Sequence, residues 1–182
     1  MDTSTAIREV DHLTERLRQS KRATAVNVWL LSTFDADGKP HGLAVTNTSA
    51  LADNPPSMLV SVSRQASSHP ILISTGTFCL NMIHRGQFEV LEHFSHSDKR
   101  SQRFSSGPWK SGPLGLPYLE TALANLFCRI DEAHDYGNHT VLFGRVIDVY
   151  TTDHLKSADP LIWINGRPAQ FNNCESGHAR TG

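Results

Sequence analysis

One stretch decides how the rest of the sequence is interpreted: Gly42-Leu43-Ala44-Val45-Thr46-Asn47-Thr48-Ser49-Ala50-Leu51-Ala52-Asp53-Asn54-Pro55-Pro56. It begins as a strand and ends at a double proline, which interrupts a strand ladder. Between these lie four adjacent hydrogen-bonding side chains, Thr46, Asn47, Thr48 and Ser49. Such a run makes a poor hydrophobic core, but it suits the wall of a site for a flat, polar, phosphorylated ligand.

The direction of these side chains depends on whether the strand is continuous. In a continuous strand Thr46 and Thr48 face one side, and Asn47 and Ser49 face the other. Only one pair then lines a ligand site, unless the strand breaks into a loop. Backbone amides of the run, and those of Ala50 and Leu51, are further donors. The alternative is an edge strand with a solvated face, since threonine is common in strands.

The sequence on both sides of this stretch predicts mostly strands. An apolar stripe with three- and four-residue steps predicts a helix over residues 4–20. Further helices are expected at 87–95 and, capped by Ser67 or Ser68 with Pro70 in its first turn, just after residue 68. Residues 96–117 are expected to form a long ordered loop. Strands are predicted at 26–34, 41–49, 57–63, 77–83, 123–131, 139–150 and 161–164. Hairpin-like turns at 35–40, 135–138 and 165–167 favour an antiparallel barrel with peripheral helices over a parallel α/β sheet.

The composition excludes several classes of function. The 182 residues fit one domain, with a helix at 1–20, a main domain at 21–171 and a polar tail at 172–182 that is expected to be disordered. A net charge of −1 indicates neither nucleic-acid nor membrane binding. There is no signal peptide and no apolar run long enough to span a membrane, so a cytoplasmic protein is expected. No Gly-x-Gly-x-x-Gly motif supports a Rossmann fold.

Metal binding is also not expected. The three cysteines are far apart, and Cys79 and Cys128 lie in apolar runs typical of a core. Asp35 and Asp37 are interpreted as turn residues, because no further acidic residues follow at the spacing of a calcium loop. The histidines show no spacing that predicts a metal site.

Several motifs, taken in order, resemble the flavin reductase-like family with the FMN-binding split-barrel fold. After the polar run and its double proline come Arg64-Gln65-Ala66-Ser67-Ser68, then Arg103-Phe104, Gly112-Pro113-Leu114-Gly115-Leu116-Pro117, Gly137-Asn138-His139-Thr140 and Gly166-Arg167. The resemblance covers about residues 20–171. It implies a mainly β, antiparallel split barrel with a few peripheral helices. The family often carries more hydroxyls in the polar run, and commonly an aspartate where this chain has Asn138.

The resemblance implies a flavin site and assigns roles within it. Arg64, Ser67 and Ser68 match the segment that contacts the phosphate, to which a guanidinium gives charge-assisted hydrogen bonds. The residues expected to line the cofactor are Thr46, Asn47, Thr48, Ser49, Ala50, Leu51, Arg64, Ser67, Ser68 and Arg103. His139 matches a position near flavin and nicotinamide and is the expected catalytic residue, with a positioning role and, as a second role, proton transfer. Two alternatives remain. Arg64 is then a surface arginine and Ser67 or Ser68 an ordinary helix cap, and the basic group around Arg103 is solvated.

The activity implied is reduction of FMN or FAD by NADH or NADPH. The family also implies a homodimer, and a flavin-dependent monooxygenase that receives the reduced flavin by diffusion. Two alternatives remain open: a flavin-binding module with little reductase activity, and a reductase that uses flavin to reduce a non-flavin acceptor such as a corrinoid or ferric complex.

Overall fold

The computed structural model describes residues 3–96, 98–153, 155 and 159–169. The chain forms two compact units, one from residues 1–25 with 162–182 and one from residues 26–161. The predicted tail at 172–182 lies outside the described residues, and the predicted domain boundaries remain predictions. Among the helices described, none is long and apolar enough to cross a membrane.

The first unit contains the N-terminal helix and a small hairpin. Helix α1 spans Thr3–Arg22, as the apolar periodicity predicted, and its Leu13 and Leu17 side chains are exposed. Strand β11 (Ile162–Ile164) pairs with β12 (Arg167–Pro168). Asn165 and Gly166 have φ angles of 53° and 77°, the left-handed conformation that a two-residue hairpin turn requires. The predicted turn at 165–167 is therefore confirmed.

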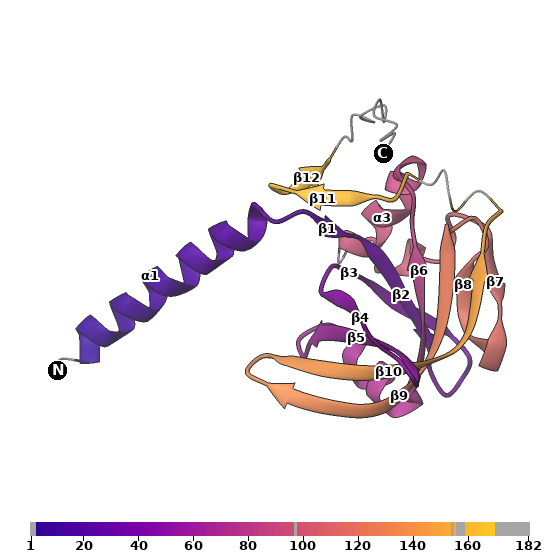
Figure 1. The fold of residues 1–182 in the computed structure, drawn as a ribbon, viewed down its shortest axis with the longest axis horizontal. Coiled ribbons are helices and arrows are strands. Elements are labelled where there is room, and N and C mark those ends of the chain that lie inside the picture. The colour runs from indigo at the N-terminus through magenta and orange to yellow at the C-terminus, as the bar shows by residue number, and fades with distance from the viewer. Residues whose placement is uncertain (1–2, 97, 154, 156–158, 170–182) are drawn as a thin grey trace, which may run out of the picture. The chain divides into compact units, whose positions relative to one another are not determined.

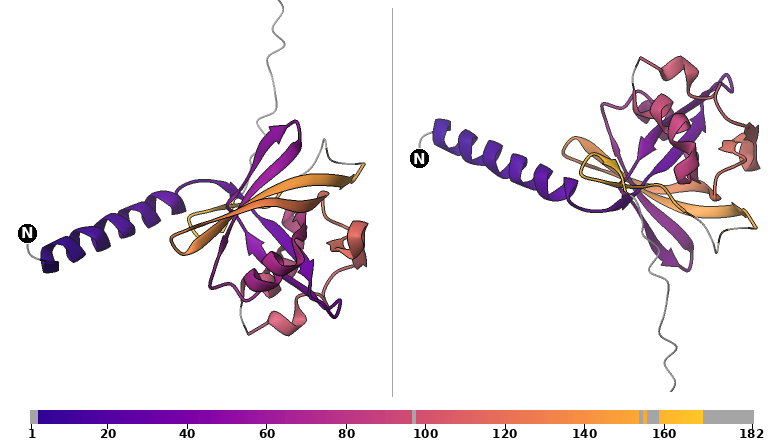
Figure 2. Two further views of the ribbon diagram at one scale, coloured as in Figure 1. Left: turned by 90° about the horizontal axis from the view of Figure 1, so that it is seen from below. Right: turned by 90° about the horizontal axis from the view of Figure 1, so that it is seen from above.

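The second unit is built on a seven-stranded antiparallel sheet, in the order β3-β2-β6-β9-β10-β5-β4 (Figures 1 and 2). This confirms the mainly β, antiparallel fold that the sequence predicted. The helices of this unit are α2 (His69–Thr75) and α3 (Phe88–Ser95), with short 3-10 helices η1 (Arg85–Gln87), η2 (Arg100–Gln102) and η3 (Pro113–Gly115). The strands are β1 (Val26–Asn27), β2 (Trp29–Phe34), β3 (Pro40–Val45), β4 (Thr48–Asp53), β5 (Pro56–Ser63), β6 (Thr77–Met82), β7 (Trp109–Ser111), β8 (Pro117–Leu119), β9 (Ala124–Tyr136) and β10 (His139–Thr151).

The turn between β2 and β3 depends on one carboxylate. Oδ1 of Asp35 accepts hydrogen bonds from the amides of Asp37 and Lys39, at 3.1 and 2.9 Å. Oδ2 of Asp35 lies 2.8 Å from Nε2 of His41. The hydrogen bond from His41, together with the two amides, lowers the pKa of Asp35 from its usual value. Asp35 therefore acts in the turn, as predicted.

The expectation of a loop without strands at 96–117 was wrong. Strands β7 and β8 form a hairpin, with Trp109 opposite Leu119 and Ser111 opposite Pro117. Each strand is only three residues long, and glycine and proline residues surround both of them. Segments this short show too little alternation to indicate a strand from the sequence.

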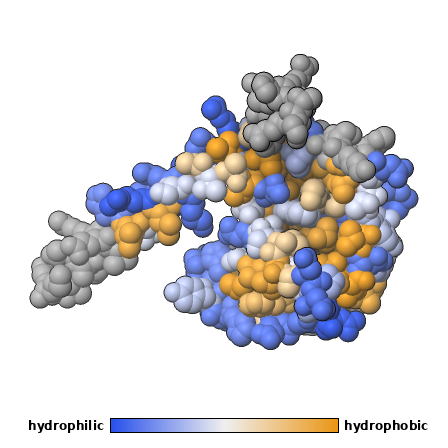
Figure 3. All heavy atoms as spheres, in the orientation of Figure 1, coloured by the Kyte–Doolittle hydropathy of each residue, from blue (hydrophilic) through white to orange (hydrophobic). Residues whose placement is uncertain are grey.

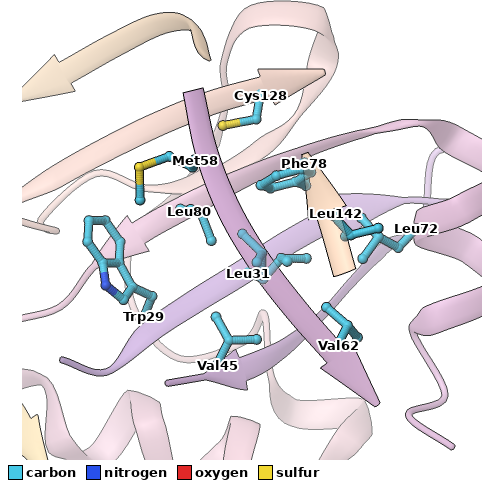
Figure 4. Close-up of a cluster of buried hydrophobic side chains, with 11 residues drawn as sticks. Trp29, Leu31, Val45, Met58, Val62, Leu72, Phe78, Leu80, Cys128 and Leu142 are labelled. Carbon is cyan, nitrogen blue, oxygen red and sulfur yellow. The ribbon is translucent and has the colours of Figure 1, made fainter. Parts of the chain in front are cut away.

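The main core lies on one face of the sheet, and a smaller cluster lies on the other. Alternation along β6 places Phe78 and Leu80 in the main core and Cys79 in the smaller cluster with Leu116 and Phe127. Figure 4 shows how the main-core side chains from several strands and from α2 point toward one another. That core consists of Trp29, Leu31, Val45, Met58, Val60, Val62, Leu72, Phe78, Leu80, Cys128 and Leu142.

The two cysteines of this unit are core residues, as predicted. Both thiols are free and buried. Burial raises the pKa of Cys128 to about 12 and raises that of Cys79 well above its usual value. Both are therefore neutral, weakly reactive thiols near neutral pH.

A buried amide joins the β7–β8 hairpin to the sheet. Nδ2 of Asn81 donates to the Leu30 carbonyl at 2.8 Å and to Oγ of Ser32 at 3.0 Å. Its Oδ1 accepts from the Leu119 amide at 2.8 Å and from Nδ2 of Asn125 at 2.9 Å. Because Asn81 is fully buried, water cannot replace these partners. One side chain thus connects β2, β6, β8 and β9.

Replacing Asn81 with alanine should destabilise the protein strongly. The change leaves the buried Leu119 amide and Asn125 side chain without their acceptor, which costs roughly 2–4 kcal/mol in the free energy of unfolding. Denaturant unfolding measures this change. The control Gln102→Ala removes an exposed amide and should change stability by less than about 0.5 kcal/mol. Equal effects of the two substitutions would contradict this role of Asn81.

Candidate functional site

Some of the predicted site residues lie near the C-terminal end of β5. On one side of this strand, Thr48 of β4 lies opposite Val60, and the Ser61 amide donates to the Asn47 carbonyl at 2.9 Å. On the other side, His139 of β10 lies opposite Ser63. The polar run and His139 therefore flank the end of the same strand, although more than 90 residues separate them in the sequence.

The polar run is not one continuous strand. Strand β3 ends at Val45 and β4 begins at Thr48, so Thr46 and Asn47 form the link between them. Thr46, Asn47 and Ser49 are exposed, and Thr48 is half-buried. Because of this break, Thr46 and Asn47 do not follow strand alternation. Their adjacent side chains can therefore face the same ligand.

Ala50 and Leu51 lie farther from this convergence. Ala50 is opposite Met58, and the ladder is irregular at Leu51. Met58 precedes Ser63 by five residues, which corresponds to about 16 Å along a strand. The structure therefore brings the Thr46–Asn47 link and Thr48 nearest to the end of β5, with Ser49 opposite Leu59 near the middle of the strand and Ala50 and Leu51 toward its beginning.

Arg64 directly follows β5 and is fixed there by its backbone. Its amide donates to the Asn138 carbonyl at 3.0 Å, in the turn between β9 and β10. The guanidinium is half-exposed, with Nη1 3.6 Å from Oδ2 of Asp135. Ser67, three residues on, is exposed. Arg64 and Ser67 thus present a cation and a hydroxyl at the end of the strand, a donor set that suits a phosphate.

Ser68 and Arg103 share an acceptor in the interior. Ser68 is the residue before α2, but its buried hydroxyl donates to the Gly42 carbonyl at 3.0 Å and makes no cap hydrogen bond. Nη1 of Arg103 donates to the same carbonyl at 2.5 Å. Nε and Nη2 of Arg103 donate to the carbonyls of His93 and Phe94, and the side chain is 7% exposed. Both residues hold backbone in place.

His139 opens β10 and is half-buried. Its Nδ1 lies 2.7 Å from Oδ1 of Asn138. Because that amide oxygen only accepts, Nδ1 of His139 carries the hydrogen. The ring is therefore oriented by its neighbour, and Nε2 is left to face other groups.

Sequence reasoning missed a chain of polar groups beside this site. Nε2 of His69 lies 2.8 Å from Oγ1 of Thr140, and that hydroxyl donates to Oδ1 of Asp135 at 2.6 Å. The available signal was strand alternation: Thr140 follows His139, so its side chain points to the opposite face of β10 and inward. Asp135 was predicted only as a turn residue.

A separate hollow of about 370 Å³ lies beside β3. It is next to Gly42, and Arg103 forms part of its wall. The basic residues at its edge include Lys39 and Arg100, together with the acidic Asp98. In the described chain, this hollow is a second place where basic side chains lie beside predicted site residues.

The arrangement at the end of β5 can bind an elongated polar ligand with a phosphate. Arg64 and Ser67 supply donors for the anion, the Thr46–Asn47 link supplies polar groups alongside, and His139 supplies an oriented ring. The histidines, cysteines and acidic residues of the described ranges do not group into a metal site.

The chain is similar to known proteins over most of its length. Residues 21–172 match the flavin reductase like domain. The chain is 33% identical over 161 residues to FMN reductase (NADH) RutF of Pseudomonas syringae pv. syringae, covering 88% of this chain and 87% of the relative. It is 31% identical over 147 residues to the reductase component of the FADH(2)-dependent resorcinol hydroxylase of a Rhizobium species, covering 81% and 80%.

A solved structure is also similar. The nitrilotriacetate monooxygenase component B homolog from Mycobacterium thermoresistibile is 26% identical, with a TM-score of 0.81, and the match covers 96% of this chain and 94% of that one. The match at residues 21–172 includes every predicted site residue, and the relatives are matched over most of their own length. The chain belongs to the flavin reductase like domain family.

Proposed function

We propose that this chain is an NAD(P)H:flavin oxidoreductase that reduces FMN or FAD and supplies the reduced flavin to a flavin-dependent monooxygenase. The observation that carries the proposal is the convergence of Arg64, the Thr46–Asn47 link and His139 on the end of β5, in a chain of this family. In the overall reaction NAD(P)H, a proton and oxidised flavin give NAD(P)⁺ and two-electron-reduced flavin.

The named relatives support both halves of this proposal. The Pseudomonas syringae relative is named for FMN and NADH, so NADH is the expected donor. The Rhizobium relative is the reductase component of an FADH(2)-dependent hydroxylase, which supports delivery of reduced flavin to an oxygenase. Both FMN and FAD carry a phosphate next to the ribityl chain, so the same donor set fits either flavin.

Each residue at the site receives a role from its position. Arg64 and Ser67 bind the flavin phosphate, and the run from Thr46 to Ser49 lies along the ribityl chain and the polar edge of the ring. Ser68 and Arg103 act from behind the site, because their donors hold the Gly42 carbonyl. Ala50 and Leu51 contribute through backbone at the far end of the ligand.

The bound flavin supplies the two-electron acceptor, and the protein supplies alignment. Hydride transfer requires the nicotinamide and the flavin ring to stack in register more than it requires acid–base chemistry. His139 is suited to that task, because its bond to Asn138 fixes the ring plane. Its Nε2 is free of that bond and faces the nicotinamide carboxamide in the proposed arrangement.

We also propose that the second unit associates as a homodimer. Figure 3 shows apolar side chains gathered on its surface in the region of β4, β5 and β10. Leu51 on β4 and Ile147 and Val149 on β10 are 44%, 42% and 48% exposed. Exposed apolar groups of this kind mark association surfaces.

Val149→Glu should shift the species seen by sedimentation velocity toward monomer, because it places a charge on this surface. Ile73→Glu changes a similarly exposed side chain on α2 and should cause no such shift.

One experiment tests the activity directly. The purified protein is mixed with FMN or FAD under anaerobic conditions and titrated with NADH or NADPH while the flavin absorbance is followed. Bleaching in proportion to the donor added is the expected result. Flavin that binds but is not bleached would indicate a flavin-binding module. Efficient turnover only after a ferric or corrinoid acceptor is added would indicate the other alternative.

Arg64→Gln should weaken FMN binding without affecting riboflavin, which lacks the phosphate. Loss of a half-exposed charge-assisted contact is expected to raise the Kd for FMN by about tenfold. Flavin fluorescence titration measures both ligands. The control is Arg145→Gln, because Arg145 has similar exposure and also pairs with an aspartate. Equal losses for FMN and riboflavin would place the phosphate elsewhere.

His139→Gln should slow hydride transfer while FMN binding stays the same. Misalignment of the reacting rings is expected to lower the single-turnover rate by roughly tenfold to a hundredfold. Stopped-flow bleaching of bound flavin by NADH measures this rate. His134→Gln changes an exposed histidine on β9 and should leave the rate unchanged. An unchanged rate in His139→Gln would remove His139 from the site.

A further inference from the structure

Asp135 lies next to the one cation that the proposed site offers to a phosphate. Its Oδ2 is 3.6 Å from Nη1 of Arg64, longer than a close charge-assisted hydrogen bond. The two side chains are 56% and 51% exposed. The contact is therefore a loose, hydrated ion pair, whose partner a stronger anion can replace.

The other oxygen of this carboxylate is held much more firmly. The Thr140 hydroxyl donates to Oδ1 of Asp135 at 2.6 Å, and Thr140 is 2% exposed. Thr140 has a single hydroxyl hydrogen, so toward His69 its oxygen can only accept. Nε2 of His69, 2.8 Å away, must therefore carry a hydrogen and donate.

The hydrogen bonds run in one direction, from half-buried His69 through buried Thr140 to the exposed carboxylate. His69 donates to Thr140, Thr140 donates to Asp135, and the remaining carboxylate oxygen faces Arg64. Donors aligned in this way reinforce one another. The carboxylate of Asp135, near the end of β9, is thus anchored by Thr140 of β10 and through it by His69 of α2, and its other oxygen stays directed at the guanidinium.

We propose that Asp135 is a built-in competing anion that lowers the affinity of the site for phosphate-bearing flavins, and that Thr140 and His69 are positioning residues for its carboxylate. This inference rests on the proposed function of Arg64 as the phosphate-binding group. A dianionic phosphate entering the site displaces the carboxylate from Arg64 and is also repelled by it. The consequence is faster release of flavin, which suits a protein that delivers reduced flavin to a partner.

The test compares the binding of FMN and of riboflavin to variants of the intact chain, first to one in which the charge of Asp135 is removed. Asp135→Asn should bind FMN about threefold to tenfold more tightly than the unmodified protein, because the competitor and the repulsion are removed. Riboflavin affinity should not change. Stopped-flow displacement of bound FMN should show that the gain in affinity comes from slower FMN dissociation. The gain should shrink as salt is raised, since the groups are exposed.

Matched variants separate this role from a structural one. Asp131→Asn removes a carboxylate that pairs with Arg145 on the same two strands, and it should leave FMN affinity unchanged. Thr140→Val should give part of the gain seen in Asp135→Asn, and Thr140→Ser, which keeps the hydroxyl, should restore the original affinity. His69→Phe removes the donor to Thr140, and is expected to behave like Thr140→Val.

The opposing results are distinct. Weaker FMN binding in Asp135→Asn, or equal changes for FMN and riboflavin, would overturn the proposal and make Asp135 a structural residue of the β9–β10 pair. A gain in Asp135→Asn with no gain in Thr140→Val and His69→Phe would overturn the positioning role of Thr140 and His69. If the unmodified protein bound neither FMN nor riboflavin, the proposed function itself would fail. This result is obtained with the unmodified protein alone and is distinct from the results for the variants.

Discussion

The carbonyl of Gly42 is the point on which the arrangement of the second unit depends. It accepts hydrogen bonds from both Ser68 and Arg103. A side chain at position 42 would not fit, since a Cβ atom would lie 2.5 Å from the Leu31 carbonyl oxygen and 2.9 Å from the Phe94 ring. The absence of a side chain therefore lets β3 lie against α3, while one backbone oxygen ties the start of α2 to the segment around Arg103.

This constraint explains why the proposed site lies where it does. With Ser68 anchored to β3, the short segment from Arg64 to Ser68 is fixed at both ends, by Asn138 at its start and by Gly42 at its end. Arg64 and Ser67 remain on the outside of that segment, with the Arg64 guanidinium held by its loose pair with Asp135. The proposed site thus lies on the surface and is held in place by buried contacts, which fits the proposed delivery of reduced flavin to a partner.

Much of the fold could be predicted from the sequence, because strand alternation and turn residues are local signals. The turns at Asp35 and at Asn165-Gly166 are examples. The β7–β8 hairpin could not be predicted, since its strands depend on a distant amide, that of Asn81. The order of motifs led to a predicted location for the site, which stays a prediction. The interior contacts could not be predicted, because the bonds of Ser68 and Arg103 to Gly42 and of His69 to Thr140 join segments far apart in the sequence. Strand alternation could indicate only that Thr140 points inward.

The most direct test of this account is a crystal structure of the protein with FMN bound. We expect the phosphate between Arg64 and Ser67, with Asp135 displaced from the guanidinium, and the ring alongside the Thr46–Asn47 link and His139. A phosphate bound instead in the hollow lined by Lys39 and Arg100 would contradict it.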